Sequence, residues 1–304
     1  MTVDLTAIVG SVELANPVMT AAGTAGHSTE LLPLLDLPRL GAHVVKSLAA
    51  FEWAGNPAPR LHPAGLGMLN AVGLQGPGLG AWRRDDLPAL TRAGITTVVS
   101  IWGRSVADYA AAAEQLADLP ANVVAVEVNL SCPNLEGRRG IFAHDPELSA
   151  EVIRATTCGL PRWAKLSPNT DRVVEVAAAV QAAGADAVTL TNTLLGLVVD
   201  PVTRKPALGA GGGGYSGAPI HAVVVRTVFD VHAAHPELPV VGVGGIGTGW
   251  DAVELLLAGA SAVQVGTATF AEPAAPVRVL GELQVWMERH GVATVGELTG
   301  AAHT

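Results

Sequence analysis

The stretch Val123-Val124-Ala125-Val126-Glu127-Val128-Asn129-Leu130-Ser131-Cys132-Pro133-Asn134 runs from a largely apolar segment directly into a cluster of polar and reactive side chains. The run from Val123 to Val128 is rich in β-branched residues, which is typical of a buried strand. Pro133 cannot continue a sheet ladder, so the strand should end at Cys132. Taken alone, the segment is more simply interpreted as a buried cysteine in a turn with two asparagine caps. Its function therefore depends on the rest of the chain.

Short runs of this kind alternate with Ala- and Leu-rich stretches along the chain, which is the pattern of a parallel sheet with crossover helices. We predict eight strands, each followed by a helix: Pro17–Ala22, His43–Ser47, Thr96–Ile101, Val123–Asn129, Arg162–Leu166, Ala187–Thr191, Pro239–Val243 and Ala262–Val265. The predicted helices include Val106–Ala117, Asp145–Cys158, Asp171–Ala183, Pro219–Ala234, Trp250–Ala258 and Pro273–His290. Eight repeats predict an α/β fold of the closed (β/α)8 or TIM barrel type, with residues 1–304 in a single domain.

Two long insertions interrupt the repeats, and both are dense in glycine and proline. Leu48 to Pro77 follows the second strand, and Leu194 to Ser216 follows the sixth. Loops of this length in a compact barrel usually serve as lids or as walls of a binding site. Elsewhere the connections are short, and Gly184 and Gly259 are expected to end helices as C-caps.

Composition excludes several classes of protein. The chain has 304 residues, 49% hydrophobic and 15% charged, which describes a globular protein. A net charge of −9 argues against nucleic acid as a partner. Its two cysteines lack CxxC spacing, so we expect no disulfide, metal or iron–sulfur site and a reducing, cytoplasmic location. The chain shows neither a signal peptide nor a membrane-spanning run. Five histidines without metal-ligand spacing are interpreted as structural or surface residues: His27, His43, His62, His144 and His221.

Polar residues gather where the predicted strands end, which is where (β/α)8 barrels place their active sites. These strand-end residues are Ala22, Gly23, Thr24, Lys46, Ser47, Asn129, Cys132, Lys165, Asn192, Thr193, Gly244, Gly245, Gly266 and Thr267. Lys46 and Lys165 each interrupt an apolar strand, and burial of an ammonium group without an anion is costly. We therefore favour an anionic ligand between them. A snorkelling lysine or an ion pair with Glu127 is the alternative.

Two further patterns indicate what the ligands are. Gly242 to Gly247 matches GxGxxG, but it follows the seventh strand instead of the first, so it favours the phosphate of a mononucleotide such as FMN over NAD. Alternatively these glycines only permit tight turns. Four asparagines lie at different strand ends or loops and suit a flat cyclic amide or imide, although each alone is more simply a turn residue: Asn70, Asn129, Asn134 and Asn192.

Nearly the whole chain resembles the class 1, type B dihydroorotate dehydrogenases. The matching stretches are Asn16–Met19 with Ala22–Thr24, Val45–Ser47, Gly55–Pro57 with Pro59–Arg60, Gly67–Gln75, Glu127–Asn134, Lys165–Asn169, Thr191–Leu194, Tyr215–Gly217, Gly242–Gly247 and Val263–Phe270. The resemblance implies an FMN-bearing barrel that oxidises dihydroorotate to orotate in pyrimidine synthesis.

The resemblance also implies residue roles. Cys132 would remove the C5 proton of dihydroorotate while a hydride leaves C6 for flavin N5. A free thiol has a pKa of about 8.5, so activity should rise with pH. Lys165 would lie against the flavin, and Lys46 would approach both the flavin and the substrate carboxylate. The orotate ring would be held by Asn70, Asn129, Asn134, Asn192 and Thr193. The flavin would also contact Ala22, Gly23, Ser47 and Asn129, and its phosphate would contact Gly217, Gly244, Gly245, Gly266 and Thr267.

Type B relatives work with a second subunit that carries FAD and an iron–sulfur cluster and passes electrons to NAD. The resemblance therefore implies such a partner for this chain, together with a homodimeric core and no membrane attachment. Trp102 and His27 depart from the family pattern, and they keep open a related flavoenzyme acting on another dihydropyrimidine or cyclic amide. A flavin-binding barrel with only a structural or regulatory role and a flavin-free phosphate-binding isomerase are the remaining alternatives.

Overall fold

The computed structural model describes residues 2–131 and 140–303. Within these ranges eight parallel strands form one sheet in the order β3-β16-β15-β10-β9-β8-β7-β4. Their bounds are β3 (Val18–Thr20), β4 (His43–Val44), β7 (Thr97–Ile101), β8 (Val123–Asn129), β9 (Arg162–Lys165), β10 (Ala187–Leu190), β15 (Val240–Val243) and β16 (Ala260–Val265). The sheet closes because Gly41 N donates to Val18 O and Thr20 N donates to Ala42 O, which joins β3 to the residues before β4. The predicted (β/α)8 barrel is confirmed.

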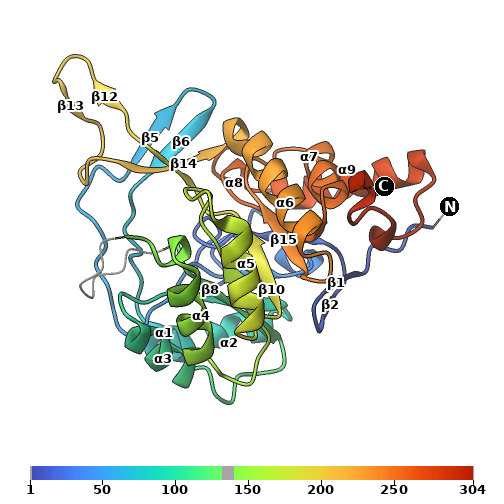
Figure 1. The fold of residues 1–304 in the computed structure, drawn as a ribbon, viewed down its shortest axis with the longest axis horizontal. Coiled ribbons are helices and arrows are strands. Elements are labelled where there is room, and N and C mark those ends of the chain that lie inside the picture. Colours follow the sequence, from blue (N-terminus) through green and yellow to red (C-terminus); the bar gives the residue numbers. More distant parts are fainter. Residues whose placement is uncertain (1, 132–139, 304) are drawn as a thin grey trace.

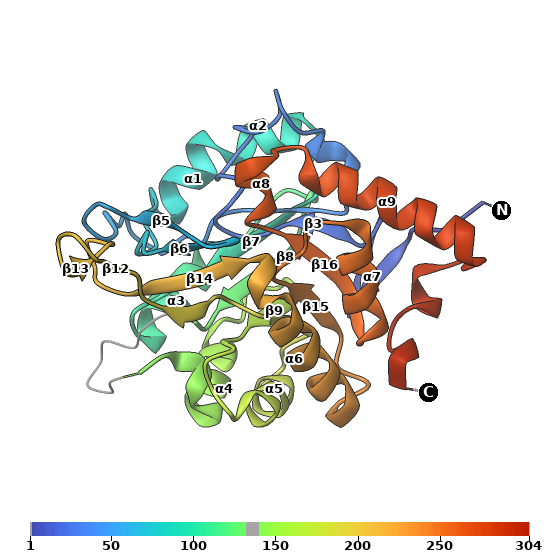
Figure 2. The ribbon, with the colours of Figure 1, turned by 90° about the horizontal axis from the view of Figure 1, so that it is seen from above.

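Helices surround the strands of the barrel (Figure 2). They are α1 (Leu79–Asp85), α2 (Leu87–Arg92), α3 (Val106–Glu114), α4 (Pro146–Ala155), α5 (Val173–Ala182), α6 (His221–Ala234), α7 (Gly249–Leu257), α8 (Ala268–Ala271) and α9 (Ala275–His290). Side-chain caps explain where several begin. Ser105 accepts a hydrogen bond from Asp108 N ahead of α3, and Asp145 accepts from Glu147 N and Leu148 N ahead of α4. The six helices predicted from the sequence are confirmed, with shifted ends.

One expectation about the connections is wrong. The described segment between β3 and β4 forms turns and the short 3-10 turn η1 (Leu37–Arg39) in place of a helix after the first strand. Four further 3-10 turns occur in the described ranges: η2 (Phe142–His144), η3 (Ala218–Ile220), η4 (Val295–Glu297) and η5 (Ala301–His303). Proline at one of the first positions of η1 and the β-like conformation of Leu40 at its end keep this connection from extending into a helix.

An N-terminal hairpin, which the sequence did not predict, covers the amino-terminal end of the barrel. It consists of β1 (Ala7–Val9) and β2 (Val12–Leu14), whose alternate residues are buried. Its turn at Gly10 packs so closely that a Cβ atom there would lie 2.8 Å from the carbonyl oxygen of Asp186, immediately before β10. Because one end of the barrel is covered in this way, the carboxyl ends of the strands are the open end where ligands can enter.

The two insertions pair with each other beside the barrel, although they are far apart in the sequence. From Leu48 to Pro77 come β5 (Leu61–Ala64) and β6 (Gly67–Asn70), and from the second insertion come β11 (Leu194–Gly196) and β14 (Gly213–Gly217). They form an antiparallel sheet in the order β11-β14-β6-β5, with Asn70 opposite Gly214. The small hairpin of β12 (Val199–Asp200) and β13 (Lys205–Pro206) extends beyond it (Figure 1). The insertions therefore build a single wall.

None of the helices in the ranges 2–131 and 140–303 is both long enough and apolar enough to cross a membrane.

Candidate active site

A fully buried carboxylate, Glu127, organises the interior of the barrel near the carboxyl ends of the strands. Its Oε1 atom lies 3.4 Å from Lys165 Nζ and accepts a hydrogen bond from Ser100 Oγ at 3.2 Å, while its Oε2 accepts from Gln264 Nε2 at 2.8 Å. These four residues come from β8, β9, β7 and β16. The ion-pair alternative therefore holds for Lys165, whose ammonium group already has an anionic partner.

The same network reaches the predicted ligand-binding residues. Ser47 Oγ lies 2.8 Å from Ser100 Oγ and accepts a hydrogen bond from Asn129 Nδ2 at 3.3 Å. Asn129 Oδ1 in turn lies 3.4 Å from Asn192 Nδ2. The backbone of Asn129 is held by Tyr109, whose hydroxyl donates to its carbonyl oxygen at 2.6 Å. The predicted residues Ser47, Asn129 and Asn192 thus lie together, and their positions are tied through buried hydroxyl groups to the Glu127 carboxylate.

Lys46 differs from Lys165 in its surroundings. It is half-buried, and among residues 2–131 and 140–303 its ammonium group has no hydrogen-bond or ion-pair partner. Burial lowers the pKa of Lys46, and repulsion from Arg60 lowers it further. Both effects disfavour the charged lysine in the absence of an anion. A small anionic ligand at this strand end would relieve both of them.

The amide of Asn70 and the hydroxyl of Thr193 lie on either side of the inserted strand β14. Asn70 Nδ2 donates to Gly214 O at 3.3 Å. A Cβ atom at Gly214 would collide with the Thr193 hydroxyl, so only glycine fits there. Asn169, which the sequence interpretation did not single out as a site residue, holds this region in place by donating from Nδ2 to Thr193 O at 3.0 Å and accepting at Oδ1 from Leu195 N at 2.8 Å.

Ser100 and Gln264 were also missed as site residues. Each is a polar residue inside an otherwise apolar run, and this was the signal available in the sequence. Gln264 is fully buried, and its Oε1 atom has no hydrogen-bond partner among the described residues. Both strands carry a polar residue here because Ser100 and Gln264 each donate a hydrogen bond to the Glu127 carboxylate.

The glycine-rich turn after β15 and the Gly217 turn at the end of β14 both lie near the start of α6. Gly244 has φ of 140° and Gly245 has φ of 73°, and a Cβ atom at Gly245 would lie 2.5 Å from His221 Cβ. Close packing against α6 therefore requires glycine at both positions, which supports the tight-turn interpretation for these two. The Gly217 turn adjoins Thr267, because Thr267 Oγ1 lies 2.8 Å from Ser216 Oγ.

Two other predicted cofactor contacts, Gly23 and Gly266, lie at the ends of β3 and β16. Gly23 has φ of 92°, and no heavy atom of the described chain lies within 4 Å of the position that a Cβ atom would take. A Cβ atom at Gly266 would lie 3.2 Å from the Ala21 side chain. Ala22, which directly precedes Gly23, is half-buried. Open space beside Gly23 leaves room for a ligand at this strand end.

Cys132 and Asn134 lie outside the described residues. The described part of this segment ends at Ser131, whose backbone N–H donates to Asn129 Oδ1 at 3.2 Å. Ser131 thus lies at the end of β8, directly beside the Asn129 side chain.

Trp102 and His27, the two departures from the family pattern, have defined environments. The Trp102 ring lies edge-on to Phe51 and Trp53, with ring centroids 6.0 Å away in each case, so it packs against the first insertion. Burial lowers the pKa of His27 to about 4, and the nearby positive charge of Lys46 contributes. His27 therefore lies close to Lys46 as a neutral imidazole at physiological pH.

Comparison with known proteins identifies a family. The family model described as "Dihydroorotate dehydrogenase" matches residues 4–287. A protein of Desulforudis audaxviator is 44% identical over 305 residues, covering 100% of this chain and 99% of its own length. A protein of Geotalea uraniireducens is 43% identical, with 99% of each chain covered, and one of Pelobacter propionicus is 42% identical, with 98% of each chain covered. All three are named "Dihydroorotate dehydrogenase B (NAD(+)), catalytic subunit".

Proposed function

The chain belongs to the dihydroorotate dehydrogenase family, whose members are oxidoreductases acting on the CH–CH bond of dihydroorotate, and we propose that it oxidises dihydroorotate to orotate with FMN as its cofactor. The observation that carries this proposal is the half-buried Lys46 ammonium, which has no partner among residues 2–131 and 140–303 and lies at the same barrel mouth as the Asn129 and Asn192 amides. Dihydroorotate offers the matching chemistry, because it joins a carboxylate to a cyclic imide.

The residues present fit FMN. Lys165 is held by Glu127 near the barrel mouth, and Gly23 leaves open space beside its backbone. The hydroxyl pair of Thr267 and Ser216 lies next to the Gly217 turn and offers hydrogen bonds to a phosphate. The residues proposed to hold FMN are Ala22, Gly23, Lys46, Ser47, Asn129, Lys165, Gly217, Gly244, Gly245, Gly266 and Thr267. Bound FMN would supply a hydride acceptor.

Substrate binding rests on charge and on amide hydrogen bonds. Lys46 pairs with the carboxylate of dihydroorotate, and ligand binding thereby removes the cost of an unpaired ammonium group. The ring is held by Asn70, Asn129, Asn134, Asn192 and Thr193. Cys132 acts as the base that accepts the C5 proton, the C6 hydrogen departs as a hydride, and the C5–C6 double bond of orotate forms. Asn169 acts as a positioning residue because it holds the backbone of Thr193.

The electron acceptor is inferred from the relatives. Their printed names include NAD(+) and the words "catalytic subunit". We infer that this chain is likewise one subunit of a larger enzyme and that a second subunit, carrying FAD and an iron–sulfur cluster, passes electrons to NAD. The two cysteines of this chain are too few to ligate such a cluster, which supports the assignment of the cluster to a partner. A homodimer of barrels forms the core of this assembly.

Anaerobic reduction of the purified protein tests the proposal. The cofactor is first released and identified by mass, and FMN is expected. Addition of dihydroorotate should then bleach the flavin absorbance and yield orotate. A flavin that stays oxidised with dihydroorotate but is bleached by another dihydropyrimidine or cyclic amide would overturn the substrate assignment and favour the related flavoenzyme. A protein purified without flavin, and unable to bind added FMN, would overturn the cofactor assignment.

A further inference from the structure

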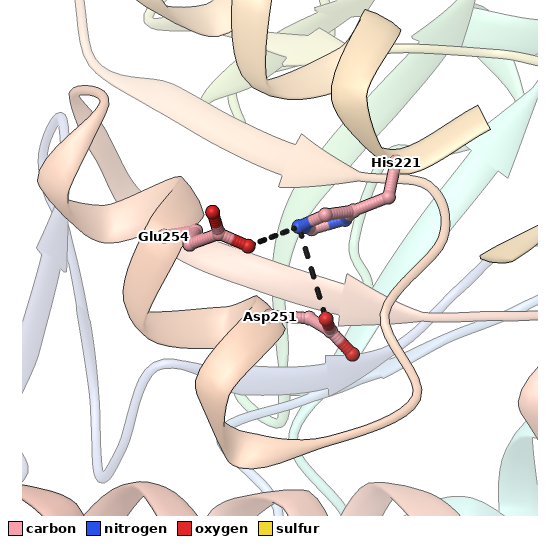
Figure 3. A group of neighbouring side chains, drawn as sticks. All are labelled: His221, Asp251 and Glu254. Atoms are coloured by element: carbon pink, nitrogen blue, oxygen red, sulfur yellow. Dashed lines mark hydrogen bonds and ion pairs between the residues drawn. The ribbon is translucent and has the colours of Figure 1, made fainter. Parts of the chain in front are cut away.

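His221, Asp251 and Glu254 form a compact cluster outside the proposed active site (Figure 3). His221 is the first residue of α6, and the two carboxylates project from α7. One ligand atom from each residue lies within 4.8 Å of the others. Sequence spacing showed no metal-ligand pattern for His221, because its neighbours in the cluster come from a different helix about thirty residues further on.

The hydrogen bonds of His221 determine what its ring presents to the carboxylates. Its Nδ1 atom lies 3.1 Å from the carbonyl oxygen of Gly244, and since a carbonyl only accepts, Nδ1 must carry a hydrogen. Its Nε2 atom faces Glu254 Oε2 at 3.2 Å and Asp251 Oδ1 at 3.9 Å. A neutral ring in this tautomer points a lone pair at two carboxylate oxygens, which is repulsive. A metal ion between the three atoms would turn this repulsion into coordination by all three.

The surroundings preorganise the cluster for a metal ion. Asp251 Oδ2 is used in the cap of α7, where it accepts from Gly247 N at 2.9 Å, Thr248 N at 2.8 Å and Thr248 Oγ1 at 2.9 Å. Its Oδ1 atom is left to face His221. A histidine that donates Nδ1–H to a backbone carbonyl while Nε2 faces outward has the arrangement commonly found for metal-ligating histidines. Both the ring and one carboxylate are thus oriented before any ion arrives.

The two separations from the imidazole nitrogen to the carboxylates fit a small divalent ion. Ligands placed about 2.0–2.2 Å from Zn²⁺ at tetrahedral angles lie roughly 3.3–3.6 Å from one another. The observed 3.2 Å and 3.9 Å from His221 Nε2 to the two carboxylates bracket this range. One imidazole nitrogen with two carboxylate oxygens suits Zn²⁺ and other first-row ions rather than Ca²⁺ or Mg²⁺, which prefer ligand sets made of oxygen alone.

An adjoining pocket leaves space for the remaining coordination positions. It has a volume of about 390 Å³ and is lined by His221, Ala222, Val225, Arg226, Phe229 and Glu254. Water molecules can therefore complete the shell of an ion held by three protein ligands. We propose that His221, Asp251 and Glu254 bind one divalent transition-metal ion of the Zn²⁺ class, which links the start of α6 to α7 beside the Gly244–Gly245 turn.

Titration of the flavin-loaded protein with ZnCl₂, followed by calorimetry and by metal analysis after dialysis, tests this site. The Glu254→Gln variant removes one ligand charge but keeps both the cap made by Asp251 and the hydrogen bond from His221 to Gly244. The wild type should bind one Zn²⁺ per chain, and Glu254→Gln should bind it at least tenfold more weakly. Zn²⁺ should also raise the thermal unfolding midpoint of the wild type more than that of the variant.

Glu151→Gln is the matched control, because Glu151 is an exposed carboxylate in the middle of α4 and its loss changes the net charge equally. It should bind Zn²⁺ as tightly as the wild type. Wild type that binds no Zn²⁺ would overturn the proposal. Zinc binding of equal strength in wild type and Glu254→Gln would also overturn it, since the ion would then be held elsewhere.

Discussion

The ammonium nitrogen of Lys165 lies 3.4 Å from Oε1 of Glu127, and the two side chains expose only 6% and 0% of their surface. Removal of two charges from water is costly, and the pair is acceptable here because Ser100 and Gln264 also donate hydrogen bonds to the carboxylate. Loss of one partner would leave the other charge buried and uncompensated. The network therefore fixes the position of Lys165, and the stability of the folded barrel depends on Glu127.

Substitution Glu127→Gln should reduce the free energy of unfolding by about 3–5 kcal/mol, because it leaves the buried Lys165 ammonium unpaired. Urea unfolding followed by circular dichroism measures this. Glu175→Gln is the control, since Glu175 pairs with Arg172 at the shorter distance of 2.7 Å but on the surface. That exposed pair should contribute less than about 1 kcal/mol. Equal losses in the two variants would contradict the buried-pair argument.

Lys46→Met should keep the free energy of unfolding unchanged or raise it, because Lys46 has no partner among the described residues and burial disfavours its charge. The same substitution should weaken orotate binding about ten- to hundredfold, as expected for a hydrogen bond between charged groups. Orotate affinity is measured from the change in flavin absorbance. Lys205→Met, at an exposed position of β13, should leave the affinity unchanged. Unaltered binding in Lys46→Met would remove Lys46 from substrate recognition.

Cys132→Ser should slow flavin reduction by dihydroorotate by about 10²–10⁴-fold near neutral pH, because a serine hydroxyl is a much weaker base. Stopped-flow absorbance gives the rate. Cys158→Ser provides the control, since Cys158 is half-buried between α4 and β9 and burial raises the pKa of its thiol. The control should react at the wild-type rate. If Cys132→Ser were reduced equally fast, another group would have to be the base.

Asn169→Ala should loosen the second insertion, because it removes the hydrogen bonds to Thr193 O and from Leu195 N. At about 1 kcal/mol for each bond, amide hydrogens of residues 194–217 should exchange roughly ten- to thirtyfold faster. Asn122→Ala removes hydrogen bonds to Ile95 O and from Thr91 Oγ1, but Asn122 lies just before β8. It should not change exchange in the insertion. Equal exchange rates in both variants would show that Asn169 does not hold this segment.

His43 should make folding sensitive to acid. Burial lowers its pKa from 6.5 to about 4 in the folded protein, so between these values only the unfolded chain takes up the proton. The contribution is therefore complete above pH 6.5 and is lost as the pH falls toward 4, by about 3 kcal/mol. His43→Gln should flatten the fall in unfolding free energy between pH 7 and pH 5, whereas His290→Gln, at an exposed position, should not. An unchanged slope in His43→Gln would contradict this origin.

The barrel itself was predictable because its strands are buried on both faces, and this leaves a short, largely apolar run at most of the repeats. The run Val123–Asn129 was located without error, and the other strands within a few residues. Polar residues that follow such runs were correctly expected to gather, and Ser47, Asn129 and Asn192 do lie together. Periodicity and the carboxyl-end rule for parallel sheets are properties of the chain itself.

Only the tertiary structure distinguished residues that look alike in the sequence. Lys46 and Lys165 each interrupt an apolar strand, yet Glu127 reaches only Lys165, because β8 and β9 are neighbours in the sheet. In the same way, the pairing of β6 with β14 could not be predicted from the sequence of either insertion, because the residue pattern of a strand does not specify which strand it pairs with. The sequence by itself determined the barrel and the end at which its chemistry is expected. Contacts between distant segments decided which lysine is paired with Glu127 and which helices bring His221 to Asp251 and Glu254.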